Sequence, residues 1–277
     1  MSDVTKADQG GGSDQDPFES TKMPLMDHVV ELRNRLMWSV GAVIICFVIA
    51  YVFSAEIYEL LTRPLYIASG GREDVRTMIF TAPQEAFFTY IKVSFWLAMF
   101  VAFPMTATQV WMFVAPGLYK HERQAFLPFL LATPILFFAG GAMVYFFILP
   151  LALEFFISFQ TTGEGRIPIE LIPKVNEYLS LVMTLIFAFG LAFQLPVLLT
   201  LLARVGLVTA AGLAKRRKYA VVIIMIAAAV LTPPDPVSQI GLAVPLYLLY
   251  ELSIISARMA EKKKAEREAA EQAARDG

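Results

Sequence analysis

The polar residues that could do chemistry in this sequence gather in short clusters at the ends of long apolar runs. The first cluster is residues 23–36, in which His28, Glu31 and Arg35 recur at the spacing of one helix face. Taken alone, this pattern favours an interfacial helix on which Arg33 and Arg35 fix the orientation of the chain in a membrane and pair with Glu31. The second interpretation is a carboxylate offered to a cationic ligand, because carboxylates bind guanidinium groups through oriented, charged hydrogen bonds.

Three further clusters carry single polar residues with a plain structural interpretation. Glu122 opens the third apolar helix, where the helix dipole favours a carboxylate. Gln194 falls within an apolar run, just before Pro196, so it either joins two helices by a hydrogen bond or contacts a functional partner in the membrane. Asp235 lies in a turn with three prolines and can cap the helix that follows.

Signatures of catalysis or of a cofactor site are missing from the sequence. It contains neither a G-x-x-x-x-G-K-[S/T] loop to hold a nucleotide nor a nucleophile elbow. The two histidines, His28 and His121, have no companion ligand at metal-binding spacing. Cys46 is the single cysteine and falls within an apolar run, which excludes an internal disulfide or a cysteine-based metal cluster. The net charge of −1 gives no indication of nucleic acid binding, so we expect no enzyme activity, no cofactor, no metal and no nucleic acid partner.

The apolar runs between these clusters predict a membrane protein. Hydrophobic residues make up 57% of the 277 residues and charged residues only 17%, whereas soluble domains carry about 25% charged residues. Six runs reach or approach the roughly 20 residues that a helix needs to cross a bilayer. They are residues 36–53, 86–114, 126–149, 179–203, 219–231 and 237–257. We therefore predict an all-α fold with six transmembrane helices.

The lengths and charges of these segments predict the topology and the domain limits. Run 219–231 would span only about 20 Å as a helix, so the fifth and sixth helices should form a short hairpin. Lysine and arginine are concentrated in the segments on the same side as the two chain ends, which places both ends in the cytoplasm. We expect a disordered polar tail over 1–22, a membrane domain over 23–258 and a charged tail over 259–277.

Five segments together resemble the TatC family. They are HVVELRNRL (28–36), TAPQEAFFTYIK (81–92), QVWMFVAPGLYKHER (109–123), FGLAFQLPV (189–197) and LTPPDPVSQ (231–239), in the order and spacing of that family. The resemblance implies the multispanning core of the twin-arginine translocase of the bacterial inner membrane, with six tilted helices in a concave bundle. Such a protein recognises the paired-arginine signal peptides of folded precursors and assembles with the single-span subunits TatA and TatB.

The same resemblance implies roles for individual residues. Glu31, Arg33 and Glu122 match positions tied to signal-peptide recognition at the cytoplasmic face. Pro64, Phe113, Tyr145 and Asp235 match recurrent family positions of less defined role. Gln194 departs from the family, in which many members carry glutamate, so a mechanism that needs a titratable carboxylate there is put in doubt. Translocation driven by the proton-motive force and association of several copies are also implied.

The competing interpretation is a secondary transporter for a small solute or for protons. Gln194, Lys92 and Glu154 would line its path through the membrane. Two features of the sequence count against it, because no inverted repeat is found and few ionisable residues fall at the depth of the membrane centre. The sequence therefore favours the translocase receptor.

Overall fold

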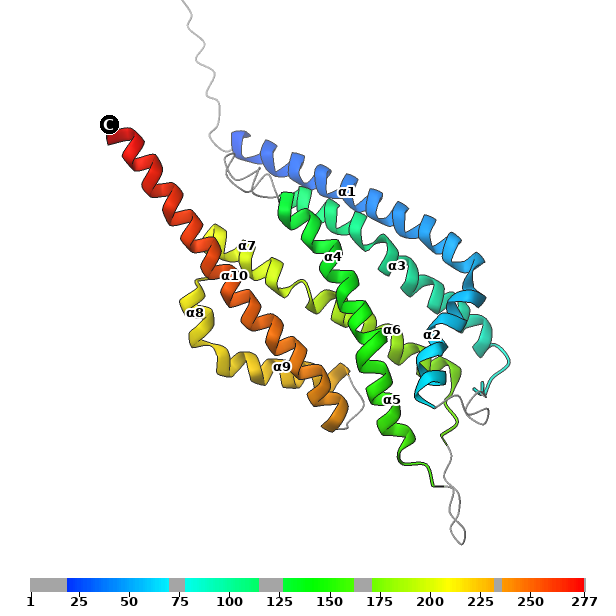
Figure 1. The fold of residues 1–277 in the computed structure, drawn as a ribbon. Helices are drawn as coiled ribbons and strands as arrows, with labels where there is room; N and C mark the ends of the chain where they lie inside the picture. Colours follow the sequence, from blue (N-terminus) through cyan, green and yellow to red (C-terminus); the bar gives the residue numbers. More distant parts are fainter. Residues whose placement is uncertain (1–18, 70–77, 115–126, 162–170, 232–235, 277) are drawn as a thin grey trace, which may run out of the picture.

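The chain folds into a bundle of long helices (Figure 1). The computed structural model describes residues 19–69, 78–114, 127–161, 171–231 and 236–276. The named elements of these residues are helices, and Ile79 forms an isolated bridge with Lys174. In the described part of the chain, five helical stretches are long and apolar enough to cross a membrane, namely His28–Val52, Glu85–Phe113, Phe129–Ile157, Val175–Val205 and Gln239–Glu266. The prediction of an all-α membrane protein is confirmed.

The first span belongs to one long helix, α1 (Glu19–Val52). It begins well before the apolar run, because the amphipathic cluster of residues 23–36 continues the same helix without a break. Helix α2 (Ser54–Ala68) follows after a single turn residue. This helix lies between the first two apolar runs and was not predicted, although Leu61 and Leu65 recur at helical spacing and pack on the core.

The second and third spans carry prolines without being interrupted. Helix α3 (Glu85–Val114) includes Pro104. The third span is built from α4 (Leu127–Met143), the π-helical turn η4 (Val144–Ile148) and α5 (Leu149–Ile157) in direct succession. It extends beyond the predicted end at residue 149, because the segment that follows is itself largely apolar and continues the helix.

The fourth span is divided in two. Helix α6 (Val175–Ala192) and helix α7 (Leu195–Val205) are separated at residues 193–194. Pro196 explains the break, because its ring nitrogen carries no hydrogen and cannot continue the ladder of backbone bonds. Gly206, with a φ of 87°, then ends α7 in the left-handed conformation that glycine adopts without strain.

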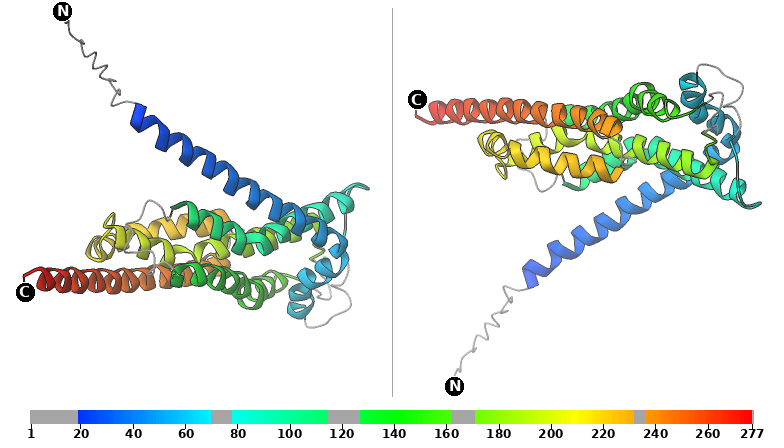
Figure 2. Two further views of the ribbon diagram at one scale, coloured as in Figure 1. Left: turned by 90° about the horizontal axis from the view of Figure 1, so that it is seen from above. Right: turned by 90° about the horizontal axis from the view of Figure 1, so that it is seen from below.

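The last three helices are α8 (Ala210–Lys215), α9 (Arg217–Leu231) and α10 (Pro236–Asp276). With 15 residues, α9 is about 22 Å long and falls short of the bilayer core, as predicted. The structure corrects the prediction of a short sixth helix, since α10 has 41 residues and the charged segment from residue 259 continues it. Figure 2 shows α10 reaching past the other helices toward the end of the molecule where α1 begins. This placement agrees with both chain ends lying on one side of the membrane.

Two close approaches between glycine and aromatic residues hold the centre of the bundle together. A Cβ on Gly140 of α4 would lie 2.7 Å from the carbonyl oxygen of Phe189 in α6. A Cβ on Gly190 of α6 would lie 2.7 Å from the ring of Phe137, which stacks on Phe103 of α3 with ring centroids 3.6 Å apart. Both positions therefore require glycine, as in other close helix crossings within membranes.

Candidate functional site

The first polar cluster lines an open groove between α1 and α3, which we call the α1–α3 groove. It encloses about 590 Å³ and is lined by Val30, Glu31, Asn34, Arg35 and Trp38 of α1 and by Met105, Gln109 and Met112 of α3. Its lining residues lie in the first half of α1 and the last part of α3. Figure 1 shows that α1 begins and α3 ends at the same end of the bundle, which is the cytoplasmic end in the predicted topology. Methionine and tryptophan give it adaptable walls around a charged centre.

Glu31 is held in this groove by an ion pair with Arg35, one helical turn along α1. The Arg35 guanidinium donates to Glu31 Oε1 from Nε at 3.0 Å and from Nη2 at 2.5 Å. Both bonds end on one carboxylate oxygen, so Oε2 is the atom that a further donor can use. The Glu31 side chain is 34% exposed and that of Arg35 23%. A pair in such a position contributes only about 0.3–0.5 kcal/mol, so it can open at small cost.

Arg33 does not take part in this ion pair. Its guanidinium donates to the Asn34 side chain at 3.4 Å on the exposed surface of α1. Two residues along a helix turn by about 200°, so Arg33 points away from Glu31. Of the two arginines that the sequence offers as partners of Glu31, the structure selects Arg35.

Phe113 stacks on His28 across the same helix pair. The ring centroids are 4.2 Å apart and the planes are inclined by 19°. His28, Glu31 and Arg35 thus share the face of α1 that meets α3, and the stacked rings lie at the cytoplasmic end of the α1–α3 groove. The periodicity of α1 was visible in the sequence, but its partner on α3 was not, because local spacing says nothing about residues so far apart in the chain.

Glu122 and Asp235, two of the predicted site residues, lie outside the described residues. The connection that carries Glu122 leaves α3 directly after Phe113 and Val114. Phe113 flanks the α1–α3 groove, so the described end of α3 lies beside the groove.

Gln194 lies at the break between α6 and α7 and bonds to a neighbouring helix. Its amide nitrogen donates to the Thr133 carbonyl of α4 at 3.0 Å and lies 3.5 Å from the Gly190 carbonyl. Because both neighbours are acceptors, the orientation of the amide is fixed, and Oε1 is buried without a partner among the described residues. A buried acceptor without a donor is unfavourable by about 1–3 kcal/mol. Gln194 therefore links the break between α6 and α7 to α4.

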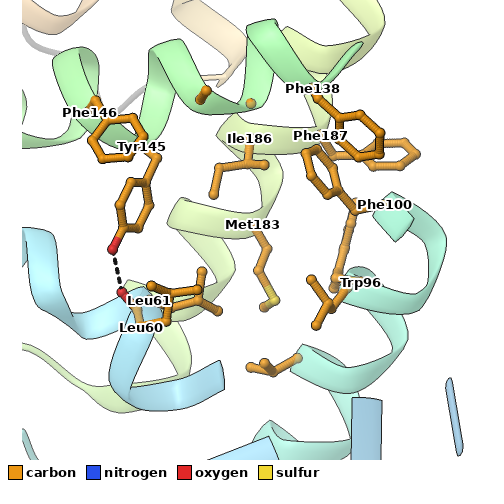
Figure 3. A pocket seen from close by; sticks show the side chains of 14 residues that line it. Leu60, Leu61, Trp96, Phe100, Phe138, Tyr145, Phe146, Met183, Ile186 and Phe187 are labelled. Carbon is orange, nitrogen blue, oxygen red and sulfur yellow. Dashed lines mark hydrogen bonds between the residues drawn. The ribbon is translucent and has the colours of Figure 1, made fainter. Parts of the chain in front are cut away.

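Pro64 and Tyr145 are joined through a single backbone carbonyl. Pro64 lies inside α2 and has no N–H, so the carbonyl of Leu60, four residues earlier, loses its helical donor. The Tyr145 hydroxyl donates to this carbonyl oxygen at 2.7 Å (Figure 3). The Tyr178 hydroxyl donates to the next carbonyl, that of Leu61, at 3.0 Å. The proline and the two tyrosines thus fasten α2 to η4 and α6.

An apolar pocket of about 320 Å³ lies beside this contact, between α2, α3, α4, η4 and α6. Figure 3 shows Trp96 and Phe100 of α3 on one side of it, Tyr145 of η4 on the other and Met183 of α6 between them. The lining is almost wholly aliphatic and aromatic. The Tyr145 hydroxyl is a polar group of the lining, and its hydrogen is donated to the Leu60 carbonyl. Such a surface suits an apolar chain and offers little to a small polar solute.

The residues of the competing transporter interpretation do not form one path. The Lys92 ammonium donates to Ser180 at 2.6 Å and to Asn176 at 3.3 Å, near the first turns of α6. Gln194 lies past the other end of α6 and bonds to α4. Glu154 is exposed on α5. Among the described residues these three side chains share no hydrogen-bond partner, so the geometry gives no support to a common proton or solute path.

These features define a multi-pass helical membrane protein whose polar centre is a groove at one membrane face. Across the described part of the chain, no group of three His, Cys, Asp or Glu side chains could hold a metal ion. The family model for the Sec-independent protein translocase protein (TatC) matches residues 27–245. The chain therefore belongs to the TatC family of protein-translocase components, as the resemblance of its five segments predicted.

Individual relatives and solved structures agree with this assignment. The chain is 53% identical over 252 residues to the Sec-independent protein translocase protein TatC of Magnetococcus marinus, covering 91% of this chain and 90% of the relative. It is 38% identical over 247 residues to the TatC of Escherichia coli, covering 88% and 92%. A crystal structure of a twin-arginine translocase receptor, TatC, matches with a TM-score of 0.72 at 37% identity, covering 84% of this chain and 99% of that one. The predicted family, fold and multi-pass location in the inner membrane are confirmed.

The shared carbonyl predicts that Pro64 and Tyr145 are energetically coupled. Tyr145→Phe leaves the Leu60 carbonyl without a donor and should lower the free energy of unfolding by about 1–3 kcal/mol. In a Pro64→Ala background the new N–H can bond to Leu60, so Tyr145→Phe should cost less than half as much. Tyr178→Phe is the control and should cost the same in both backgrounds, because Leu61 keeps its helical donor. Unfolding of the wild type, the two single variants and the double variant in detergent gives the free energies of this double-mutant cycle. Coupling would be contradicted if the losses of the single variants add up to the loss of the double variant.

Proposed function

We propose that this chain is the receptor subunit that binds twin-arginine signal peptides at the cytoplasmic face, in the α1–α3 groove. The observation that carries the proposal is the position of Glu31, a partly exposed carboxylate in an open groove that already accepts a guanidinium group, that of Arg35. A peptide arginine can take the same place, because carboxylates bind guanidinium groups in a fixed and often bidentate geometry.

The pair with Arg35 is weak and ends on Oε1 alone, so a peptide arginine that donates to both carboxylate oxygens of Glu31 binds more strongly than Arg35 does. The rest of the affinity is assigned to a second carboxylate and to the apolar walls of the groove. Adjacent side chains of an extended peptide point to opposite sides, so two arginines need two carboxylates, and Glu122 is the proposed second one. Arg33, on the exposed side of α1, is proposed to contact the polar part of the peptide outside the groove.

The receptor domain of this proposal comprises residues 23–258, between the tails 1–22 and 259–277. Its proposed partners are the TatA-type and TatB-type single-span subunits, further copies of the same chain, and folded precursors moved by the proton-motive force. Gln194 supports a contact with a partner helix or with the signal peptide inside the membrane, because its Oε1 is a buried acceptor without a donor among the described residues. The role is binding and transport rather than catalysis, since the described lining of the groove offers an ion pair and amides but no nucleophile beside a base.

The first test compares the two members of the ion pair. Glu31→Gln keeps the shape of the side chain and removes its charge, so affinity for a twin-arginine peptide should fall about tenfold or more, because a charged hydrogen bond is worth roughly 1.5–3 kcal/mol. Arg35→Gln removes the internal competitor and should leave the affinity unchanged or raise it. Glu154→Gln, on α5 at the opposite end of the bundle, is the control for loss of one carboxylate. Titration of a labelled peptide and of its twin-lysine version against the purified proteins gives the affinities.

The plainer interpretation makes a different prediction. If Glu31 serves only its ion pair with Arg35, then Glu31→Gln and Arg35→Gln should weaken the protein alike and leave the preference for arginine over lysine intact. Equal effects of Glu31→Gln and Arg35→Gln on peptide affinity, with the preference for arginine intact, would therefore contradict the proposal for Glu31.

The second test concerns Gln194. Gln194→Glu should retain export, because a protonated carboxyl group can donate to the Thr133 carbonyl as the amide does. Gln194→Leu removes both the link to α4 and the buried acceptor, so it should weaken co-purification with a TatB-type subunit and lower export of a twin-arginine reporter. If the leucine variant co-purifies with the TatB-type subunit and exports the reporter as well as the wild type does, the proposed contact of Gln194 is wrong. Gln194 would then be only a dispensable link between helices.

A further inference from the structure

A second groove lies between α4, α7 and α10, and we call it the α4–α7–α10 groove. It encloses about 330 Å³, and its apolar walls include Phe129 and Ala132 of α4, Pro196 and Val197 of α7, and Met259 of α10. Two cations also line it, Arg204 of α7 and Lys263 of α10. Its described lining residues include no acidic side chain. The groove therefore combines a hydrocarbon wall with a positive charge.

The positive charge lies at one end of this groove. Arg204 is the last residue but one of α7, and Phe129 is in the first turn of α4, so both lie at the cytoplasmic face in the predicted topology. The Arg204 guanidinium lies over the Phe129 ring, 4.7 Å from its centroid. This cation–π contact holds the charge directly against the apolar wall. Pro196, at the start of α7, lies deeper in the membrane.

Acidic side chains close to Lys263 in sequence are engaged with other groups. Glu261 accepts a hydrogen bond from the backbone amide of Ala210 at 2.7 Å. Glu266 pairs with Lys262 at 3.8 Å. The charge that faces the groove from its described residues is therefore positive.

From this arrangement we infer that the α4–α7–α10 groove binds an acidic phospholipid of the cytoplasmic leaflet. The phosphate lies between Arg204 and Lys263, and one acyl chain runs along the apolar wall toward Pro196. Basic residues at the cytoplasmic ends of membrane helices attract anionic headgroups, and apolar grooves between helices accept acyl chains. A single-span protein helix fits this groove less well, because it would bring an apolar surface against two cations.

The inference is tested by native mass spectrometry of the protein after equilibration with equal amounts of phosphatidylglycerol and phosphatidylcholine. The wild type should retain one phosphatidylglycerol with at least about fivefold preference, and the Arg204→Gln/Lys263→Gln variant should show less than about twofold. Lys215→Gln/Lys218→Gln removes the same charge from the same membrane face and should keep the preference. The Arg204→Lys/Lys263→Arg variant changes both side chains and retains both charges, so it should keep the preference for phosphatidylglycerol. This variant shows that a loss of preference comes from lost charge and not from disturbed folding.

A second variant distinguishes a lipid in the groove from headgroup attraction at the surface. Ala132→Phe fills the apolar wall and leaves both cations in place, so it should abolish retention of phosphatidylglycerol. A large excess of inorganic phosphate should not displace the lipid, because phosphate lacks the acyl chain. The inference is overturned if the wild type shows no preference, if Ala132→Phe binds as the wild type does, if phosphate displaces the lipid, or if a single-span subunit occupies the groove instead.

Discussion

Inside a bilayer no water can satisfy a backbone carbonyl or amide, and this constraint governs where the chain can bend. At two such irregularities a side chain donates a hydrogen bond to the backbone of another element. Tyr145 donates to the Leu60 carbonyl that Pro64 leaves without a partner, and Gln194, at the break before α7, donates to the carbonyl of Thr133. Local irregularities thus become long-range links that position α2 and α7 against the rest of the bundle.

Charged side chains are also unfavourable inside the bilayer, so they are confined to the membrane faces. This constraint explains the ion pair in the α1–α3 groove. An unpaired carboxylate at the membrane interface would be unfavourable, and Arg35 neutralises Glu31. The pair is exposed enough to open at a cost of about 0.5 kcal/mol or less. A peptide guanidinium group can replace Arg35 on Glu31 and donate to both carboxylate oxygens, whereas a lysine ammonium group acts as a single point charge. In the proposed mode of binding, selectivity for arginine over lysine follows from this geometry.

The sequence predicted the features that depend on local pattern. Long apolar runs located the membrane helices, and the spacing of His28, Glu31 and Arg35 identified the face that lines the groove. Helix α2 was missed because its fifteen residues are too short and too polar for a span. The stacking of His28 on Phe113 and the exclusion of Arg33 from the ion pair depend on how helices pack, which no local pattern encodes.

We propose that the arginine pair of a signal peptide enters the α1–α3 groove beside Glu31. This position can be measured with a photo-crosslinking residue at Gln109, which lines the groove from α3, and with Tyr219, exposed at the start of α9, as the comparison site. We expect a crosslink from Gln109 to the residues next to the two arginines, lost when both are lysine, and little crosslinking from Tyr219. Equal crosslinking from both sites, or a Gln109 crosslink that survives replacement of the arginines, would contradict it.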